Sequence, residues 1–170
     1  VIKEGELVWT FESGRQTYNE DSPLVTSKTI YDVASLTKVT STSPVAMKLV
    51  EQKKLPLDEP INEFIPDFSG GDKDKITIRH MLTHSAGLQA YDEFPLGTTG
   101  EEIVSSIVER PLVAVPGEKY IYSDFGPILL GKIMEKVTGR ALEDLATSYV
   151  FRPLGMIMEK VTGRALEDLA

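Results

Sequence analysis

Cysteine is absent from the 170-residue sequence, and acidic side chains outnumber basic ones. The absence of cysteine excludes disulfides, a thiolate nucleophile and a thiolate metal site, and it leaves the redox compartment open. The formal net charge of −8 argues against nucleic acid and anionic membrane surfaces as partners, because both bind basic faces. Apolar runs are short, so no membrane span is predicted. A small-molecule substrate is compatible with this composition.

The remaining composition, 41% hydrophobic and 26% charged, is that of a globular chain with enough apolar residues for one core. β-formers concentrate in residues 1–11, which predict a hairpin with strands at 1–2 and 7–11 and a turn between them. Two strands cannot fold alone, so further strands must come from elsewhere. Because the chain begins at Val1, without methionine or an apolar leader, we expect a mature form or an excised fragment.

Ser35 and Lys38 stand three residues apart at the predicted start of a helix, a spacing that puts both side chains on one helical face. A serine hydroxyl is a weak nucleophile until a base takes its proton, and a partly desolvated lysine with a lowered pKa can be that base. Ser35 would also lie near helical N–H groups that can hold an oxyanion. The alternative is a serine N-cap followed by a surface lysine. Further along, Pro44 should kink the helix.

The only two histidines, His80 and His84, lie four residues apart in a short helix predicted for 78–84, with Thr77 as its N-cap and Gly87 ending it. Two histidines at this spacing are half of a zinc motif. The residue after His80 is Met81, however, where the His-Glu-x-x-His motif needs a glutamate. We therefore expect a packed or hydrogen-bonded histidine pair and no metal site.

A second candidate cluster of functional side chains is Tyr122-Ser123-Asp124. It follows a helix predicted for 103–110, which a capping box over 99–102 begins and Pro111 ends. A tyrosine phenol beside a cation can ionise and act as a general base. The alternative for Tyr122 is a half-buried aromatic side chain without a chemical role.

Four segments, in this order and at these separations, resemble the serine beta-lactamase and penicillin-binding-protein superfamily: IYDVASLTKV, LVEQKKLPLDEPINEFIPDF, ITIRHMLTHSAGL and PGEKYIYSDFGPILLGKIMEKVTG. The branch they resemble most holds class C beta-lactamases, D-alanyl-D-alanine carboxypeptidase-like proteins and related esterases. The resemblance extends up to Met156. It implies an α+β, beta-lactamase/transpeptidase-like fold, in which an antiparallel sheet is flanked by helices and accompanied by a helical subdomain.

The resemblance also assigns roles. Ser35 matches the serine that the family acylates, Lys38 its lysine partner, and Tyr122 the tyrosine of the Tyr-x-Asn motif. Asp124 stands at the substrate-binding position where the family often has asparagine, and a carboxylate there only accepts hydrogen bonds. The implied activity is that of a serine hydrolase, acting through a covalent acyl-enzyme on a beta-lactam, a D-amino-acid peptide or a small ester. No cofactor is expected, and a periplasmic or secreted parent protein is favoured over a cytoplasmic one.

Family members carry a further strand with Lys-Thr-Gly or a His-x-Gly variant, which this sequence lacks. We therefore expect residues 1–156 to be the N-terminal part of a longer hydrolase domain, incomplete by itself. An exposed sheet edge should then favour self-association, with poor activity and marginal stability. The alternative function is that of an inactive, truncated fragment that serves as a binding or structural module.

The sequence IMEKVTGRALEDLA occurs at 133–146 and again, without a change, at 157–170. An old repeat would have drifted, and two copies do not make a repeat array. Recent recombination, deliberate design or an error of sequence assembly would each produce such a copy. We expect residues 157–170 to be a foreign or artefactual tail.

Overall fold

The computed structural model describes residues 1–156, which divide into two compact units, residues 1–34 and the residues from Ser35 onward. The tail expected at 157–170 lies outside the described residues. No helix of the described part is both long and apolar enough to cross a membrane.

The first unit contains the predicted hairpin, with strands β1 (Ile2–Lys3) and β2 (Glu6–Leu7) paired antiparallel. The turn between them places Glu4 and Gly5 at positive φ, 54° and 83°, which is the backbone of the two-residue turns that match strand twist. The second strand ends at Leu7 and does not continue to Phe11 as predicted. Within residues 1–34 these β-formers find no third strand to pair with, and self-association through this edge stays a prediction.

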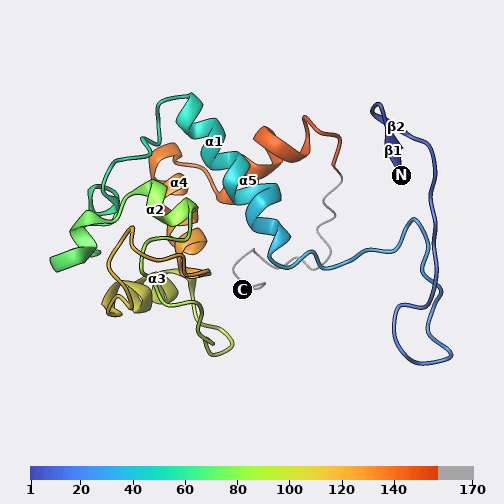
Figure 1. Ribbon diagram of the computed structural model, residues 1–170, viewed down its shortest axis with the longest axis horizontal. Helices are drawn as coiled ribbons and strands as arrows, with labels where there is room; N and C mark the ends of the chain where they lie inside the picture. Colours follow the sequence, from blue (N-terminus) through green and yellow to red (C-terminus); the bar gives the residue numbers. More distant parts are fainter. Residues whose placement is uncertain (157–170) are drawn as a thin grey trace. The chain divides into compact units, whose positions relative to one another are not determined.

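The second unit is helical (Figure 1). Its elements in chain order are η1 (Lys38–Thr42), α1 (Ser43–Glu51), η2 (Ile61–Glu63), η3 (Gly71–Lys75), α2 (Ile78–Leu82), α3 (Gly100–Glu109), α4 (Phe125–Thr138), α5 (Leu142–Ala146) and η4 (Thr147–Phe151). No strand is assigned within residues 35–156. The predicted fold class contains an antiparallel sheet flanked by helices. In the described residues, the hairpin of the first unit is the only pair of strands.

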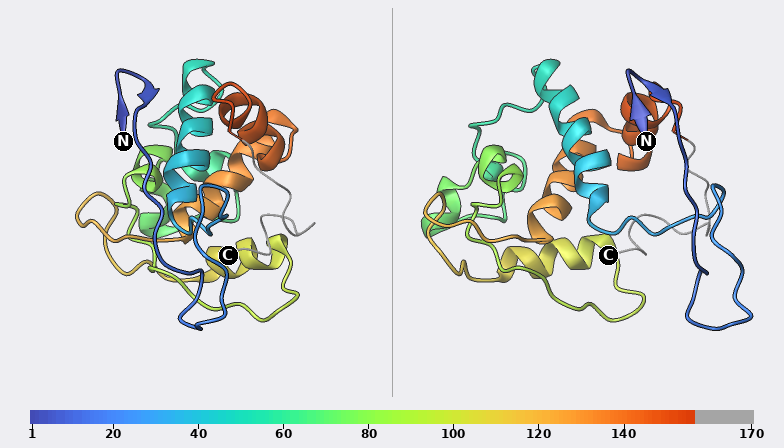
Figure 2. Two further views of the ribbon diagram at one scale, coloured as in Figure 1. Left: turned by 90° about the vertical axis from the view of Figure 1, so that its right-hand side faces the viewer. Right: turned by 45° about the vertical axis from the view of Figure 1, so that its right-hand side comes forward.

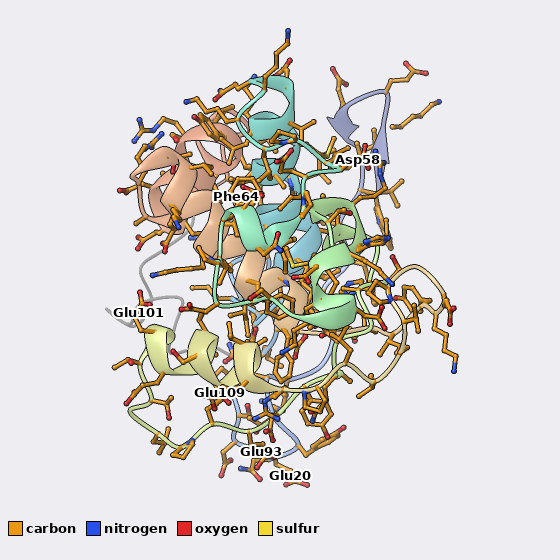
Figure 3. All side chains as sticks on the ribbon, turned by 90° about the vertical axis from the view of Figure 1, so that its left-hand side faces the viewer. Glu20, Asp58, Phe64, Glu93, Glu101 and Glu109 are labelled. Atoms are coloured by element: carbon orange, nitrogen blue, oxygen red, sulfur yellow. The ribbon has the colours of Figure 1, made fainter. Side chains whose placement is uncertain are left out.

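The core of this unit is built around α4, which contacts α1, α2, α3 and α5 (Figures 1 and 2). Fully buried apolar side chains come from each of these helices, among them Leu49, Met81, Ile107, Leu129 and Leu145. Each such side chain stabilises the fold by about 1.5–3 kcal/mol through its burial. Figure 3 labels Glu101 and Glu109 near the two ends of α3, and Glu101 forms an ion pair with Lys132 of α4.

Two predicted helix starts are confirmed. Thr99 begins α3 with a capping box, in which its N–H donates to Glu102 Oε2 at 2.8 Å and its Oγ1 accepts from the Glu102 N–H at 3.3 Å. Thr77 begins α2 with the same exchange, but the side chain that returns the bond is His80, whose Nδ1 accepts from the Thr77 N–H at 3.2 Å. An imidazole thus replaces the usual carboxylate.

The predicted end of α2 is wrong, because the helix stops at Leu82 and the chain reverses at His84, where φ is 54°. The His84 N–H bonds to Met81 O at 3.4 Å and the Ser85 N–H to His80 O at 2.9 Å. These two bonds form a Schellman motif, whose positive-φ position is usually glycine. His84 occupies that position, and Gly87 lies beyond the motif.

Candidate active site

Ser35 lies directly before the helix that carries Lys38, with the Lys38 N–H bonded to Ser35 O at 3.1 Å. The Lys38 ammonium donates to Ser35 Oγ at 3.1 Å, so the two side chains share one face as their spacing predicts. Lys38 also begins η1, a wide turn closed by the Ser43 N–H donating to Lys38 O. Pro44, which has no N–H to donate, follows this turn directly. Pro44 lies in the first turn of α1, where a missing N–H is tolerated.

The segment 117–124 is bound along the segment 84–90 by backbone hydrogen bonds. The N–H groups of Gly117, Ile121 and Asp124 donate to the carbonyls of Ser85, His84 and Ala90 at 2.8, 2.8 and 2.7 Å. Ser123 adds a side-chain bond from its Oγ to Gln89 O at 2.6 Å. This pairing brings Tyr122 and Asp124, distant in sequence, to Lys38.

The Lys38 side chain contacts residues of the segment 117–124. Lys38 Nζ lies 2.6 Å from Asp124 Oδ1 and 5.1 Å from the centroid of the Tyr122 ring. The Lys38 side chain is 18% exposed and that of Asp124 46%. The structure therefore gathers all four predicted site residues, Ser35, Lys38, Tyr122 and Asp124, around one ammonium group.

The charge state of Lys38 differs from the prediction. Burial works to lower the pKa of Lys38, but the interactions with Asp124 and Tyr122 outweigh it and hold that pKa above its ordinary value of 10.5. The expectation of a lysine with a lowered pKa, ready to act as the base, is wrong for this arrangement. Lys38 is an ammonium that donates to the serine hydroxyl.

Asp124 is committed to Lys38 through one of its oxygens. Its Oδ1 is shielded from solvent and accepts no hydrogen bond of good geometry from the described residues, so the Lys38 ammonium is what balances its charge. The second oxygen is left for other partners. A contact between Asp124 and substrate stays a prediction.

The Asp124→Asn substitution is expected to lower the pKa of Lys38, because burial would then be opposed by Tyr122 alone. A raised folded-state pKa stabilises the fold at neutral pH, and that contribution is lost as the pH rises through the raised value. In the Asn variant that contribution is smaller, and its loss is complete at lower pH. NMR titration of the lysine side chains measures the change in the Lys38 pKa. The matched control is Glu51→Gln, which removes the partner of Lys48; an unchanged Lys38 pKa in Asp124→Asn would contradict the assignment.

Lys38 lines a pocket of about 140 Å³. Its lining comes from η1, α2 and α4 and includes Val39, Met81, His84, Pro127 and Leu130. The volume is that of roughly four to five liquid water molecules. Apolar side chains line most of it, and Lys38 forms part of its wall.

His84 is the site neighbour that the sequence analysis missed. Its ring centroid lies 4.6 Å from that of Tyr122, and its Nδ1 accepts from the Ser123 N–H at 3.2 Å. The sequence shows only two histidines at helical spacing, and nothing in it says that 117–124 returns to this point. Among the described residues no group of three His, Asp or Glu side chains has an arrangement that could hold a metal ion.

A family model described as Beta-lactamase matches residues 1–168, and the chain belongs to the beta-lactamase family. It is 32% identical over 174 residues to a D-alanyl-D-alanine carboxypeptidase homologue of Escherichia coli (strain K12), covering 91% of this chain and 40% of that protein. The chain therefore spans about two fifths of the length of this relative.

Two solved structures share the fold. The octameric penicillin-binding protein homologue from Pyrococcus abyssi is 30% identical with a TM-score of 0.73, over 86% of this chain and 37% of that one. A class C beta-lactamase is 26% identical with a TM-score of 0.68, over 79% of this chain and 37% of that one. The predicted beta-lactamase/transpeptidase-like fold class is confirmed, with the described residues forming an incomplete, helix-rich part of it.

Proposed function

We propose that this chain carries the nucleophile of a serine hydrolase and that Ser35 accepts the acyl group of the substrate. The observation that supports this most is the position of Lys38 Nζ, 3.1 Å from Ser35 Oγ and 2.6 Å from Asp124 Oδ1, with the Tyr122 ring beside it. A serine hydroxyl, an ammonium group and a tyrosine close together can supply the nucleophile, a positive charge and a proton carrier for acyl transfer.

In the proposed acylation, the deprotonated oxygen of Tyr122 is the proton acceptor. The phenolate oxygen takes the proton from Ser35 as the bond from Oγ to the substrate carbonyl carbon forms. The carbonyl C–N bond then breaks, and the phenol returns that proton to the leaving nitrogen. Water attacks the acyl-enzyme by the reverse sequence, which releases the acid and restores Ser35.

The substrate class we favour is the amide bond of peptides that end in a D-amino acid, together with beta-lactams, which present a similar carbonyl. The support is the name of the Escherichia coli relative and the class C beta-lactamase fold. A small ester is the third possibility, since it needs the same nucleophile and a better leaving group. The alternative function is a non-catalytic binding module, and the observation that favours it is the Lys38–Asp124 ion pair, which keeps Lys38 from acting as the base.

Ser35 is expected to be labelled covalently when the chain is incubated with a fluorescent penicillin or a fluorophosphonate. Ser35 is exposed and receives the Lys38 hydrogen bond, so it should react before any other serine. Intact-mass spectrometry measures the single addition, and peptide mapping locates it in the segment containing Ser35.

The matched controls are Ser35→Ala, which should abolish labelling, and Ser105→Ala, which removes an exposed serine of α3 and should leave it unchanged. Labelling that persists in Ser35→Ala would refute the assignment of the nucleophile. A wild-type chain that neither reagent modifies would favour the binding module.

A further inference from the structure

His84 holds the backbone on both sides of Tyr122. The Ile121 N–H donates to the His84 carbonyl at 2.8 Å, and the Ser123 N–H donates to His84 Nδ1 at 3.2 Å. The imidazole ring lies against the Tyr122 ring, with 4.6 Å between centroids, and edge-on to Tyr120 at 5.9 Å. One residue thus accepts hydrogen bonds from the N–H groups of both neighbours of the tyrosine and contacts its ring.

The backbone of His84 makes this arrangement costly for a histidine. Its φ of 54° lies in the left-handed region, where a side chain other than that of glycine or asparagine is disfavoured by about 1–2 kcal/mol. A glycine would close the Schellman motif without that cost. A glycine could not, however, supply the Nδ1 that accepts the hydrogen bond from the Ser123 N–H. The strained backbone at His84 is accompanied by an interaction that only a side chain can make.

We propose that His84 is the positioning residue for Tyr122: its neutral imidazole, protonated on Nε2, anchors the Ser123 N–H and orients the phenol toward Lys38, and protonation of Nδ1 in mild acid releases it. The inference rests on the proposed function of Tyr122. An imidazolium has two N–H donors and no acceptor, so the Ser123 bond and the protonated ring exclude one another.

The groups around His84 favour the neutral ring. The pKa of His84 is lowered from 6.5, first by burial and then by the Lys38 charge, while Asp124 at the start of α4 opposes the shift. Tyr120 and Tyr122 face the ring from the segment 117–124, and His80 on α2 is already bonded to Thr77. A lowered folded-state pKa gives stability that is present above 6.5 and is lost as the pH falls through the folded value.

NMR on the intact chain tests the proposal without requiring any acyl transfer. With only two histidines in the sequence, each ring gives a separate titration, and His80 serves as an internal control. We expect the Ser123 amide and Tyr122 ring signals to shift with the midpoint of His84. Below that midpoint, hydrogen exchange of the Ser123 amide should be roughly fivefold faster or more than above it, after correction for intrinsic rates.

Two variants separate positioning from packing. Asparagine tolerates left-handed φ and places its Oδ1 near the position of Nδ1, so His84→Asn should keep the Ser123 amide protected at every pH and remove its titration. His84→Leu should lose the protection at every pH. Ser123 signals that follow His80, or that titrate unchanged in His84→Asn, would overturn the proposal. Because these signals are read on the unreacted chain, failure of Ser35 labelling is a separate result.

Discussion

Tyr122→Phe is expected to slow the acylation of Ser35 by roughly 10²-fold or more. The phenol oxygen is the proton acceptor that remains once Lys38 is an ammonium, and phenylalanine removes that oxygen alone. The Tyr122 side chain is 43% exposed and lies outside the core, so the fold should stay intact. The rate constant for modification by a labelled penicillin, followed by mass spectrometry in the chain and in a full-length relative, gives the measurement.

The matched control is Tyr120→Phe. Tyr120 lies on the same segment, packs edge-on against His84 and is 71% exposed. Its phenol is not among the groups that act on Lys38. Its substitution should change the rate by less than about twofold. An unaltered rate in Tyr122→Phe would remove Tyr122 from the mechanism and leave Lys38 as the sole proton carrier.

The parts of this site that could be predicted from the sequence are those fixed by local geometry. The contact between Ser35 and Lys38 follows from a three-residue spacing at a helix start. The N-cap at Thr77 and the capping box at Thr99 likewise use atoms within one turn. In each case the deciding interaction lies within a few residues, so no knowledge of the tertiary fold is needed.

The charge state of Lys38 could not be predicted in this way. A lone, partly buried lysine has a lowered pKa, whereas a lysine 2.6 Å from a carboxylate has a raised one. Which case applies depends on where Asp124 lies, and that depends on hydrogen bonds from 117–124 to 84–90. The resemblance placed Asp124 at the site as a substrate-binding residue, because the family residue at that position is an uncharged amide.

The end of α2 shows a second limit of sequence reasoning. Glycine is the usual residue at the left-handed end of a helix, and Gly87 is the nearest glycine, so the pattern favours it. In the structure His84 takes the left-handed position at the cost of strain. A sequence rule based only on backbone preference cannot predict the hydrogen bond that the Ser123 N–H donates to His84.

Gly87 instead has a contact role, and Gly87→Ala is expected to destabilise the chain by about 3 kcal/mol or more. Its φ is 72°, and a Cβ built on it would lie 2.1 Å from the carbonyl oxygen of Ala114. The Gly87 carbonyl accepts from the Val113 N–H at 2.8 Å. The segments around Gly87 and Val113 therefore cannot move apart without losing this hydrogen bond. Urea unfolding of the intact 170-residue chain measures the change in the free energy of unfolding.

Gly139→Ala is the control that isolates the contact from the backbone. Gly139 ends α4 at a φ of 66°, and nothing lies within 4 Å of the Cβ that alanine would add. Its substitution should cost only the left-handed penalty, about 1–2 kcal/mol. The excess in Gly87→Ala is then the cost of pushing 113–114 away from 84–90. Since segment 84–90 also binds 117–124, which carries Tyr122, Gly87→Ala should also slow Ser35 labelling, and Gly139→Ala should not. Equal losses of stability in the two variants would show that the Ala114 contact contributes nothing.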